Sequence, residues 1–396
     1  MRKPLGLGDA KQPGNLQRPR LGRVFCFGYL CKYERSPDFR FQTPKRINGF
    51  PRETSDTHLS HNLMQRYFLK ITAPRDAFNA EGKAPADVEN ILRQEGFKPL
   101  EIRAPRWDDL LGINARLCYQ PLEKLLQKAE ELFIQYPFYA PHSHLIIRKI
   151  LHTNLPLTVL VHDLDMLRGG HEESEPLLRK ARRLIVHTEA MKAFLCKQGF
   201  NGENIKVLQC FDYLVEHLPA PKPSFTGGND IAFAGNLEKS EFLKLLSGNK
   251  ILSSLHFLLY GATLPKDVFG ENLTYQGRFR PADLRTLKGS WGLVWDGESL
   301  TTCQGSHGLG EYLRYNASHK LSLYLASGMP VIVWQESGVA AFVNKNHLGL
   351  TVNSLEELPE RIGKLTENEK ALISKGVGIM SEKIRHGEML RNCLKN

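Results

Sequence analysis

The stretch RYNASHKLSLYLASGMPVIVW (314–334) predicts the fold most directly. Its middle part, HKLSLYLASG (319–328), is a largely apolar segment that ends in Gly328, as many helices of globular proteins do. The next residues, MPVIVW (329–334), form an apolar run typical of strands that are buried on both faces of a parallel sheet. A helix followed at once by a buried strand predicts an α/β fold.

The same alternation extends through most of the chain. Strands are predicted at 66–73 and at the starts of the segments 156–170, 182–200, 230–247, 254–262, 273–289, 291–297 and 329–334. Helices are predicted at 86–97, 120–138, 143–155, 319–328 and 366–394, and in the later parts of 182–200, 230–247 and 273–289. This pattern predicts two α/β halves of similar size, each with a parallel sheet that is covered on both faces.

The chain divides into four predicted segments. Residues 1–63 read as an irregular extension, 64–222 as the first α/β domain, 228–380 as the second, and 381–396 as a C-terminal helix. The Pro- and Gly-rich stretch APKPSFTGGND (220–230) separates the two domains. Residues 1–63 hold twelve Lys and Arg against five Asp and Glu. They are either a basic arm for nucleic acid or membrane or a dispensable extension, and the absence of an amphipathic pattern favours the extension.

Composition excludes several classes of protein. With 396 residues, 41% hydrophobic and 24% charged, the chain is too apolar for a disordered protein. Its apolar runs are shorter than the roughly 18 residues that a membrane span needs. No signal peptide opens the sequence, and the seven cysteines are scattered without a CxxC pair. These features predict a cytoplasmic protein with reduced thiols.

Candidate ligand-binding residues follow the predicted strands, because ligands of open parallel sheets bind beyond the carboxyl ends of the strands. The segments concerned are HDLD (162–165), HTEAM (187–191), AGNLEKS (234–240), WDGES (295–299) and GEYLRYNASHK (310–320). In AGNLEKS, Gly235 and Asn236 form a strand-to-helix turn and Lys239 lies in the first helical turn, where backbone N–H groups suit a phosphate. The alternative is an ordinary structural turn. Neither GxGxxG nor GxxxxGK[ST] occurs there.

The segment RYNASHK (314–320) is dense in hydrogen-bond donors. Lys320 begins the predicted helix, where the positive end of the helix dipole disfavours a cation. A bound diphosphate would remove that conflict, which favours a binding role for Lys320 over a merely solvated side chain.

Asp163 in HDLD ends a predicted strand and could act as a general base toward a hydroxyl, or simply cap the next segment. Metal chemistry is disfavoured, because PHSH (141–144) and His152 have no carboxylate or cysteine at ligand spacing. No GxSxG motif occurs, and Cys303 with His307 matches no known nucleophile arrangement.

Several blocks resemble a bacterial GT-B glycosyltransferase family. They include FAGNLEKSEFL, GLVWDGES, GEYLRYNASHKLSLYLASGMPVIVWQESGVAAFV and GLTVNSLEEL, with LVHDLDMLRG and IVHTEAMKAFL upstream. The family includes the glucosyltransferase that extends GlcNAc on serine-rich adhesins and β-1,6-galactofuranosyltransferases of surface polysaccharides. The resemblance covers about residues 65–390.

The resemblance implies two Rossmann-like domains that face each other across a cleft, with the nucleotide sugar held by the second domain. It implies no metal or other cofactor, and self-association. It assigns donor binding to Gly235, Asn236, Leu237, Tyr315, Asn316 and Lys320, with Lys239 near the diphosphate. On the acceptor side it places Asp163 in an HD motif, and we expect the acceptor near Asn79, Lys83, His162 and Arg168. Leu323 stands where many GT-B enzymes carry a ribose-binding Glu, so the resemblance does not say what holds the ribose.

Together these features predict a metal-independent, UDP-sugar-dependent hexosyltransferase with Asp163 and Lys320 as catalytic residues. It would move glucose, galactose or galactofuranose to a sugar acceptor in surface glycan or glycoprotein synthesis. The expected partners are the UDP-sugar, the glycan acceptor and further copies of the chain, with no nucleic acid and at most peripheral membrane association. The alternative is a catalytically silent nucleotide- or sugar-binding subunit of a glycosyltransferase complex.

Overall fold

The computed structural model describes residues 65–72, 82–106, 109, 111–168, 174–218, 225–304 and 309–395. All of these residues belong to one compact unit within Ser60–Asn396. The predicted extension 1–63, the acceptor-side residue Asn79 and the loop residue His307 lie outside the described residues.

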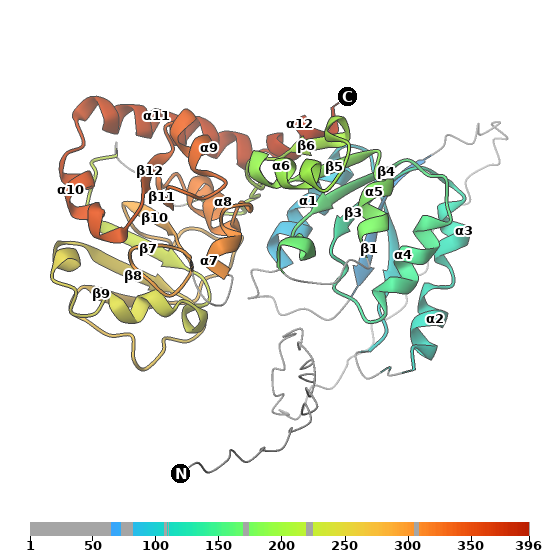
Figure 1. Cartoon of the computed structure of the whole chain (residues 1–396), viewed down its shortest axis with the longest axis horizontal. Helices are drawn as coiled ribbons and strands as arrows, with labels where there is room; N and C mark the ends of the chain where they lie inside the picture. The colour runs from blue at the N-terminus through green and yellow to red at the C-terminus, as the bar shows by residue number, and fades with distance from the viewer. Residues whose placement is uncertain are drawn as a thin grey trace, which may run out of the picture. The chain divides into compact units, whose positions relative to one another are not determined.

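The first half of the described chain is built on a six-stranded sheet in which every strand pair is parallel (Figure 1). Its central strand β4 has the sequence LTVLV and is buried along its whole length, as a strand covered on both faces must be. The strands are β1 (Gln65–Thr72), β2 (Lys98–Arg103), β3 (Ala129–Tyr136), β4 (Leu157–Val161), β5 (Arg183–Val186) and β6 (Ile205–Val207), in the order β2-β1-β3-β4-β5-β6.

Helices cover both faces of this sheet. One face packs against α1 (Lys83–Gln94) and α12 (Glu388–Leu394) through a core that includes Phe68 and Phe133. The other face packs against five helices through a core that includes Leu132 and Val159. These helices are α2 (Ile113–Tyr119), α3 (Leu122–Leu126), α4 (Ser143–Leu151), α5 (Glu175–Lys180) and α6 (Glu189–Lys197).

The second half is built on a second parallel six-stranded sheet, ordered β12-β11-β10-β7-β8-β9. Helix α8 (His319–Ala326) packs directly on β10, where a Cβ added to Gly292 would lie 2.0 Å from the Tyr324 ring. The Tyr324 hydroxyl accepts a hydrogen bond from the Ala234 N–H at 2.8 Å, which ties α8 to β7.

The strands of this second sheet are β7 (Asp230–Ala234), β8 (His256–Tyr260), β9 (Leu273–Gly277), β10 (Trp291–Val294), β11 (Val331–Trp334) and β12 (Gly349–Val352). The helices besides α8 are α7 (Leu309–Tyr312), α9 (Ala340–Lys345), α10 (Leu358–Gly363) and α11 (Glu367–Arg385). The predicted fold class, α/β with two parallel sheets, is confirmed.

The C-terminal helices belong to different halves. Helix α11 packs in the core of the second half, whereas α12 packs on the first sheet through Leu390 and Cys393 (Figure 1). Between them Gly387 has φ +77°, a left-handed conformation that glycine adopts without strain. The buried carboxylate of Asp212 accepts the N–H groups of Met389 and Leu390 at 3.0 and 2.8 Å and so caps α12. The predicted boundary at 380 falls inside α11, and the division into domains stays a prediction.

Three predicted helices are wrong. Residues 120–138 form the short helix α3 and then the strand β3, because Leu132, Phe133 and Ile134 are needed on both faces of the sheet. Residues 282–289 form no helix, since Asp283 binds the backbone N–H of Arg285 and the Tyr260 hydroxyl binds that of Lys288. The segment after β7 forms only the 3₁₀ turns η4 (Leu237–Lys239) and η5 (Glu241–Leu245).

Strands β2 and β6 and helix α2 were not predicted from the sequence. None of the helices in the described ranges is long and apolar enough to cross a bilayer.

Candidate functional site

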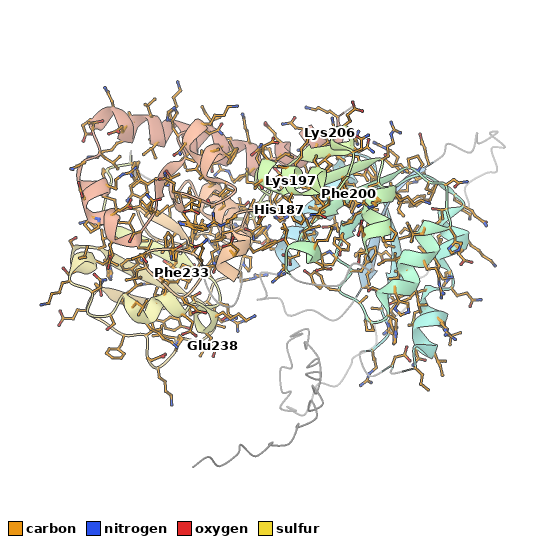
Figure 2. All side chains as sticks on the ribbon, viewed as in Figure 1. His187, Lys197, Phe200, Lys206, Phe233 and Glu238 are labelled. Carbon is orange, nitrogen blue, oxygen red and sulfur yellow. The ribbon has the colours of Figure 1, made fainter. Side chains whose placement is uncertain are left out.

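Lys320 lies in the first turn of α8, beside the carboxyl ends of β7 and β10. Its Nζ forms an ion pair with Oδ1 of Asp296 at 2.9 Å and lies 5.0 Å from the centroid of the Phe233 ring, which is labelled in Figure 2. Only 16% of the Lys320 side chain is exposed. The ammonium group is therefore held in a defined place at this edge of the second sheet.

Gly235 makes room for Lys320. A Cβ added to Gly235 would lie 3.0 Å from Cε of Lys320, which is closer than most real Cβ contacts. Gly261, which follows β8, is packed just as closely, because a Cβ added to it would lie 2.7 Å from the carbonyl oxygen of Gly235. Gly235 and Lys320, two of the residues that the family resemblance assigns to donor binding, are thus brought together.

Asp296 changes the electrostatic argument for Lys320. The sequence predicts a conflict between the Lys320 charge and the dipole of α8, to be removed by a bound diphosphate. In the structure the carboxylate of Asp296 already provides a counter-charge, and Ser318 caps the helix by accepting the Lys320 N–H at 3.4 Å. The position of the Lys320 charge at the positive end of the α8 dipole is therefore, by itself, no evidence for a bound ligand.

The turn after Gly235 differs from the prediction. Oδ1 of Asn236 accepts the N–H groups of Glu238 and Lys239 at 3.1 and 3.3 Å, so the donors expected to bind a phosphate are already used. Leu237 is buried in the hydrophobic core, whereas Asn236 and Lys239 are exposed. Of these residues, the exposed Lys239 has the charge and the reach to contact an anion.

Two polar atoms in the RYNASHK block are buried without a partner among the described residues. They are Oδ1 of Asn316 and Nε2 of His319. Burial, with smaller effects of Lys83 and His187, lowers the pKa of His319 to about 3, so its ring is neutral at pH 7. A buried polar atom without a hydrogen bond costs about 1–3 kcal/mol, so such atoms mark places where a ligand or water binds.

His187 joins the two halves, a role that the local sequence pattern does not predict. Its Nε2 donates to the Val161 carbonyl at 2.8 Å, and its Nδ1 accepts the Ala317 N–H at 3.1 Å (His187 is labelled in Figure 2). Burial lowers its pKa to about 4, which keeps the ring neutral and Nδ1 able to accept. This bond fixes the loop that precedes α8 against the end of β5.

Tyr315 lies in the same contact between the halves. Its carbonyl accepts the Thr188 hydroxyl at 2.5 Å, and its ring meets the Phe194 ring edge-on at 5.9 Å. The Tyr315 ring therefore packs on α6 of the first half.

Asp163 follows β4 and lies in a polar cluster. Its Oδ2 forms an ion pair with Arg168 at 2.9 Å and accepts the Tyr139 hydroxyl at 3.1 Å. Tyr312, from the second half, accepts the Leu164 N–H at 2.9 Å, and its hydroxyl acts to lower the pKa of Asp163. Burial raises the pKa of Asp163, against the opposing effect of Arg168. Asp163 and Arg168 are thus brought together as the sequence suggested, and the two tyrosines were missed.

The other acceptor-side residues have structural partners. His162 bonds to Oε1 of Gln135 at 2.7 Å and stacks on Phe211 with 5.2 Å between centroids. Lys83 pairs with the buried Asp87 and donates to the Leu214 carbonyl, on the segment that leads out of the first half. Burial lowers the pKa of Lys83 and raises that of Asp87 to about 6.

Within the described ranges, no three His, Cys, Asp or Glu side chains are grouped so that they could hold a metal ion. Of the PHSH histidines, His142 bonds through Nε2 to the Asp109 carbonyl at 2.6 Å.

Known proteins with similar sequences are glycosyltransferases. The glucosyltransferase 3-like family matches in two parts, its N-terminal domain over residues 66–210 and its C-terminal domain over 231–396. The beta-1,6-galactofuranosyltransferase WbbI of Escherichia coli is 30% identical over 275 residues, which cover 68% of this chain and 79% of WbbI. Glucosyltransferase 3 of Streptococcus gordonii is 30% identical over 306 residues, which cover 72% of this chain and 84% of that protein.

Solved structures with the same fold are also glycosyltransferases or UDP complexes. HepE of Anabaena in complex with UDP superposes with a TM-score of 0.53 at 12% identity, over 84% of this chain and 98% of HepE. The lipopolysaccharide outer core galactosyltransferase WaaB superposes with a TM-score of 0.54 at 11% identity, over 84% of this chain and 99% of WaaB. At this identity the likeness shows the GT-B fold. On the sequence matches, the chain belongs to the glucosyltransferase 3-like family of glycosyltransferases.

Proposed function

We propose that this glycosyltransferase transfers a hexosyl group from a UDP-sugar to a hydroxyl group of a sugar acceptor, without a metal ion. The observation that carries the proposal is the placement of Lys320. Its ammonium group is held beside the Gly235 turn, in the same block as the unpartnered buried atoms of Asn316 and His319. In this proposal these groups supply a positive charge and hydrogen bonds to the ligand at the carboxyl edge of the second sheet.

In this proposal the donor diphosphate lies against Lys320, and Lys239 approaches it from the exposed turn. As the bond from the anomeric carbon to the diphosphate breaks, its electron pair moves to the β-phosphate oxygen and the leaving UDP gains negative charge. A fixed cation stabilises that charge more in the transition state than in the bound substrate. The same work is otherwise done by a metal ion. The chemistry is thus consistent with activity in excess EDTA.

The acceptor hydroxyl would be activated by Asp163. Its carboxylate would take the hydroxyl proton while the oxygen bonds to the anomeric carbon. Burial raises the pKa of Asp163, which makes it a stronger base, and Arg168 and Tyr139 hold it in place. The names of the relatives give galactofuranose and glucose, so both are candidates, and galactose is the third sugar that we propose to test.

A second candidate, a silent nucleotide- or sugar-binding subunit, is favoured by one observation. The Asp163 carboxylate is already bound by Arg168 and Tyr139, as a purely structural carboxylate would be. Such a subunit would bind the nucleotide without turnover.

One experiment separates the two candidates. The full-length protein is incubated with UDP-glucose, UDP-galactose and UDP-galactofuranose without acceptor, and the release of UDP is followed with and without EDTA. An enzyme releases UDP slowly from its own donor by transfer to water, equally in EDTA. A protein that binds UDP with no release from any of the three donors is the silent subunit. Release that EDTA abolishes and magnesium restores contradicts the metal-independent mechanism.

A further inference from the structure

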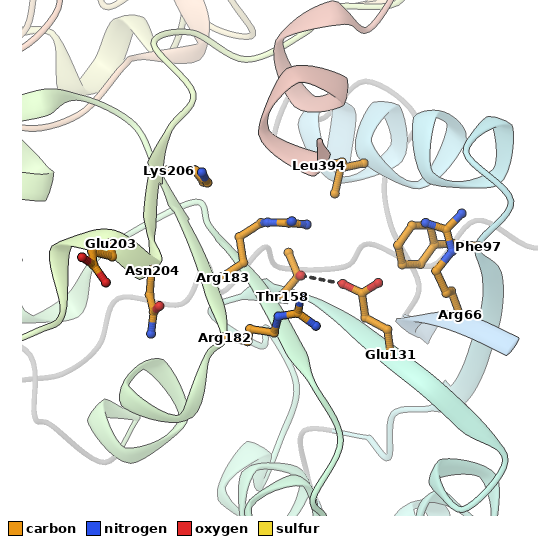
Figure 3. Close-up of a pocket in the computed structure, with 10 residues that line it drawn as sticks. All are labelled: Arg66, Phe97, Glu131, Thr158, Arg182, Arg183, Glu203, Asn204, Lys206 and Leu394. Atoms are coloured by element: carbon orange, nitrogen blue, oxygen red, sulfur yellow. Dashed lines mark hydrogen bonds between the residues drawn. The ribbon is translucent and has the colours of Figure 1, made fainter. Parts of the chain in front are cut away.

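A basic pocket lies at the amino ends of the strands of the first sheet, whereas Asp163 and His187 follow the carboxyl ends (Figure 3). Its volume is about 460 Å³. It is lined by side chains from β1, β3, β4, β5 and β6 and from the end of α12. The lining residues are Arg66, Phe97, Glu131, Thr158, Arg182, Arg183, Glu203, Asn204, Lys206 and Leu394. The pocket thus lies at the opposite end of the strands from the residues of the candidate site.

Strand register places the polar lining residues on one face of the sheet. Neighbours in register on parallel strands project to the same face, as do alternate residues of one strand. The register pairs are Arg66 with Glu131, Phe133 with Thr158, Thr158 with Arg183, and Ile185 with Lys206. Glu131 lies two positions before Phe133, and Arg183 two positions before Ile185, so these residues project to the same face. One polar row across five strands results, made of Arg66, Glu131, Thr158, Arg183 and Lys206.

Two residues further along each strand, the same face becomes apolar. Phe68, Phe133, Leu160 and Ile185 are buried there under α1 and α12. Helix α12 ends at Leu394, which lines the pocket. The row of polar residues therefore begins where α1 and α12 no longer cover this face of the sheet. The cavity forms because the sheet extends beyond these helices.

Cations outnumber carboxylates in this pocket. Four Arg and Lys side chains face two Glu, and Glu131 already accepts the Thr158 hydroxyl at 2.8 Å. Lys206 pairs in register with Ile185, so Arg183 is its diagonal neighbour on the same face, within reach of a long side chain, and two like charges at this separation repel each other. Neither Arg182 nor Lys206 forms an ion pair with any residue that the structure describes. An anion bound among the cations of the pocket would attract each of them and so offset the repulsion between Arg183 and Lys206.

We propose that the pocket binds a small, soluble, phosphate-bearing ligand with at least two negative charges. Arginine guanidinium groups bind two phosphate oxygens at once, and Lys206 adds a point charge. The ring of Phe97 and the side chain of Leu394 offer an apolar wall, and the volume suits a ligand as large as a sugar phosphate. The site is separate from the proposed donor site and does not depend on the proposed function.

Calorimetry with inorganic pyrophosphate tests the proposal. The full-length protein is titrated in low salt without UDP, because UDP is itself a phosphate-bearing anion and would compete for this pocket. We expect a site that binds pyrophosphate at least tenfold more weakly in the double variant Arg183→Gln/Lys206→Gln. Glu131→Gln keeps a hydrogen-bonding group opposite Thr158 but removes a negative charge, so binding should become two- to fivefold tighter.

The matched control is Lys250→Gln/Lys345→Gln, which removes two exposed cations from the second half. Its pyrophosphate affinity should stay within twofold of the wild type. No binding by the wild type, an equal loss in the control pair, or weaker binding by Glu131→Gln would each overturn the proposal. None of these substitutions lies in the proposed donor site, so pyrophosphate bound there would contribute equally to every titration.

Discussion

Lys320 and Asp296 form an ion pair, with 2.9 Å between Nζ and Oδ1, that links the start of α8 to the end of β10. The pair fixes the position of the lysine, yet it also gives Lys320 an anionic partner that any diphosphate must compete with.

Asp296→Asn should strengthen UDP binding by up to about fivefold. A partly exposed ion pair is worth about 0.2–1 kcal/mol, and its loss leaves Lys320 free to bind the diphosphate. Calorimetry measures the change. Asp283→Asn, which breaks the exposed Asp283–Arg285 pair of the same half, is the control and should leave the affinity unchanged. Weaker binding by Asp296→Asn would show that positioning by Asp296 outweighs competition.

Gly235→Ala should weaken UDP binding by about fivefold or more with little loss of stability. The added Cβ meets Cε of Lys320, and a flexible lysine moves aside more easily than backbone. Gly378→Ala in α11 is the matched control, because nothing lies within 4 Å of its added Cβ. It should stabilise the fold by ~0.5–1 kcal/mol and leave binding as it is. A Gly235→Ala protein with wild-type affinity would remove Gly235 from the donor site.

Asp163→Asn should lower the transfer rate by about 10²–10⁴-fold while UDP affinity stays within twofold, as loss of a general base does. Because burial raises the pKa of Asp163, the wild-type rate should fall as pH decreases through that raised value, and the residual rate of Asp163→Asn should not follow this profile. Asp165→Asn alters the neighbouring carboxylate, which accepts the Tyr136 hydroxyl at 2.6 Å, and serves as control. A loss below tenfold in Asp163→Asn would assign Asp163 a structural role.

Asp212 should make stability depend on pH. Burial raises its pKa from 3.8 to about 7 in the folded protein, so between about pH 4 and 7 the folded state binds a proton that the unfolded state has released. The free energy of unfolding should therefore fall as pH rises through this range. Urea unfolding at pH 5 and pH 8 should show a smaller drop for Asp212→Asn than for the wild type. An equal drop in both proteins would show that Asp212 does not titrate in this range.

The sequence predicted the fold well where apolar runs and glycine stops coincide. Strands such as β4 and β11 and helices such as α8 have both signals. Strand β3 was mistaken for a helix because Glu, Lys and Gln around it favour helices, and only its central place in the sheet requires Leu132, Phe133 and Ile134 to face two cores. The place of β3 between β1 and β4 is a tertiary fact that the local pattern of 120–138 does not encode.

The site could be predicted only in part for the same reason. Gly235 could be recognised in the sequence as a glycine in a turn after a strand, and Lys320 as a positive charge at the start of a helix. Asp296 is 24 residues from Lys320 and becomes its partner only when β10 and α8 pack together. His187 and Tyr312 likewise gain their roles from contacts between the halves, which no spacing within one segment reveals.

The most direct test of the donor site is calorimetry of UDP binding to Lys320→Met. Methionine keeps an apolar chain over Phe233 and removes the charge, so the fold should be unaffected. Loss of a charge-assisted hydrogen bond of about 1.5–3 kcal/mol should weaken UDP binding by about 10- to 150-fold. Lys345→Met, on the exposed end of α9, should bind UDP like the wild type. A folded Lys320→Met protein with wild-type UDP affinity would contradict the placement of the donor at the carboxyl edge of the second sheet.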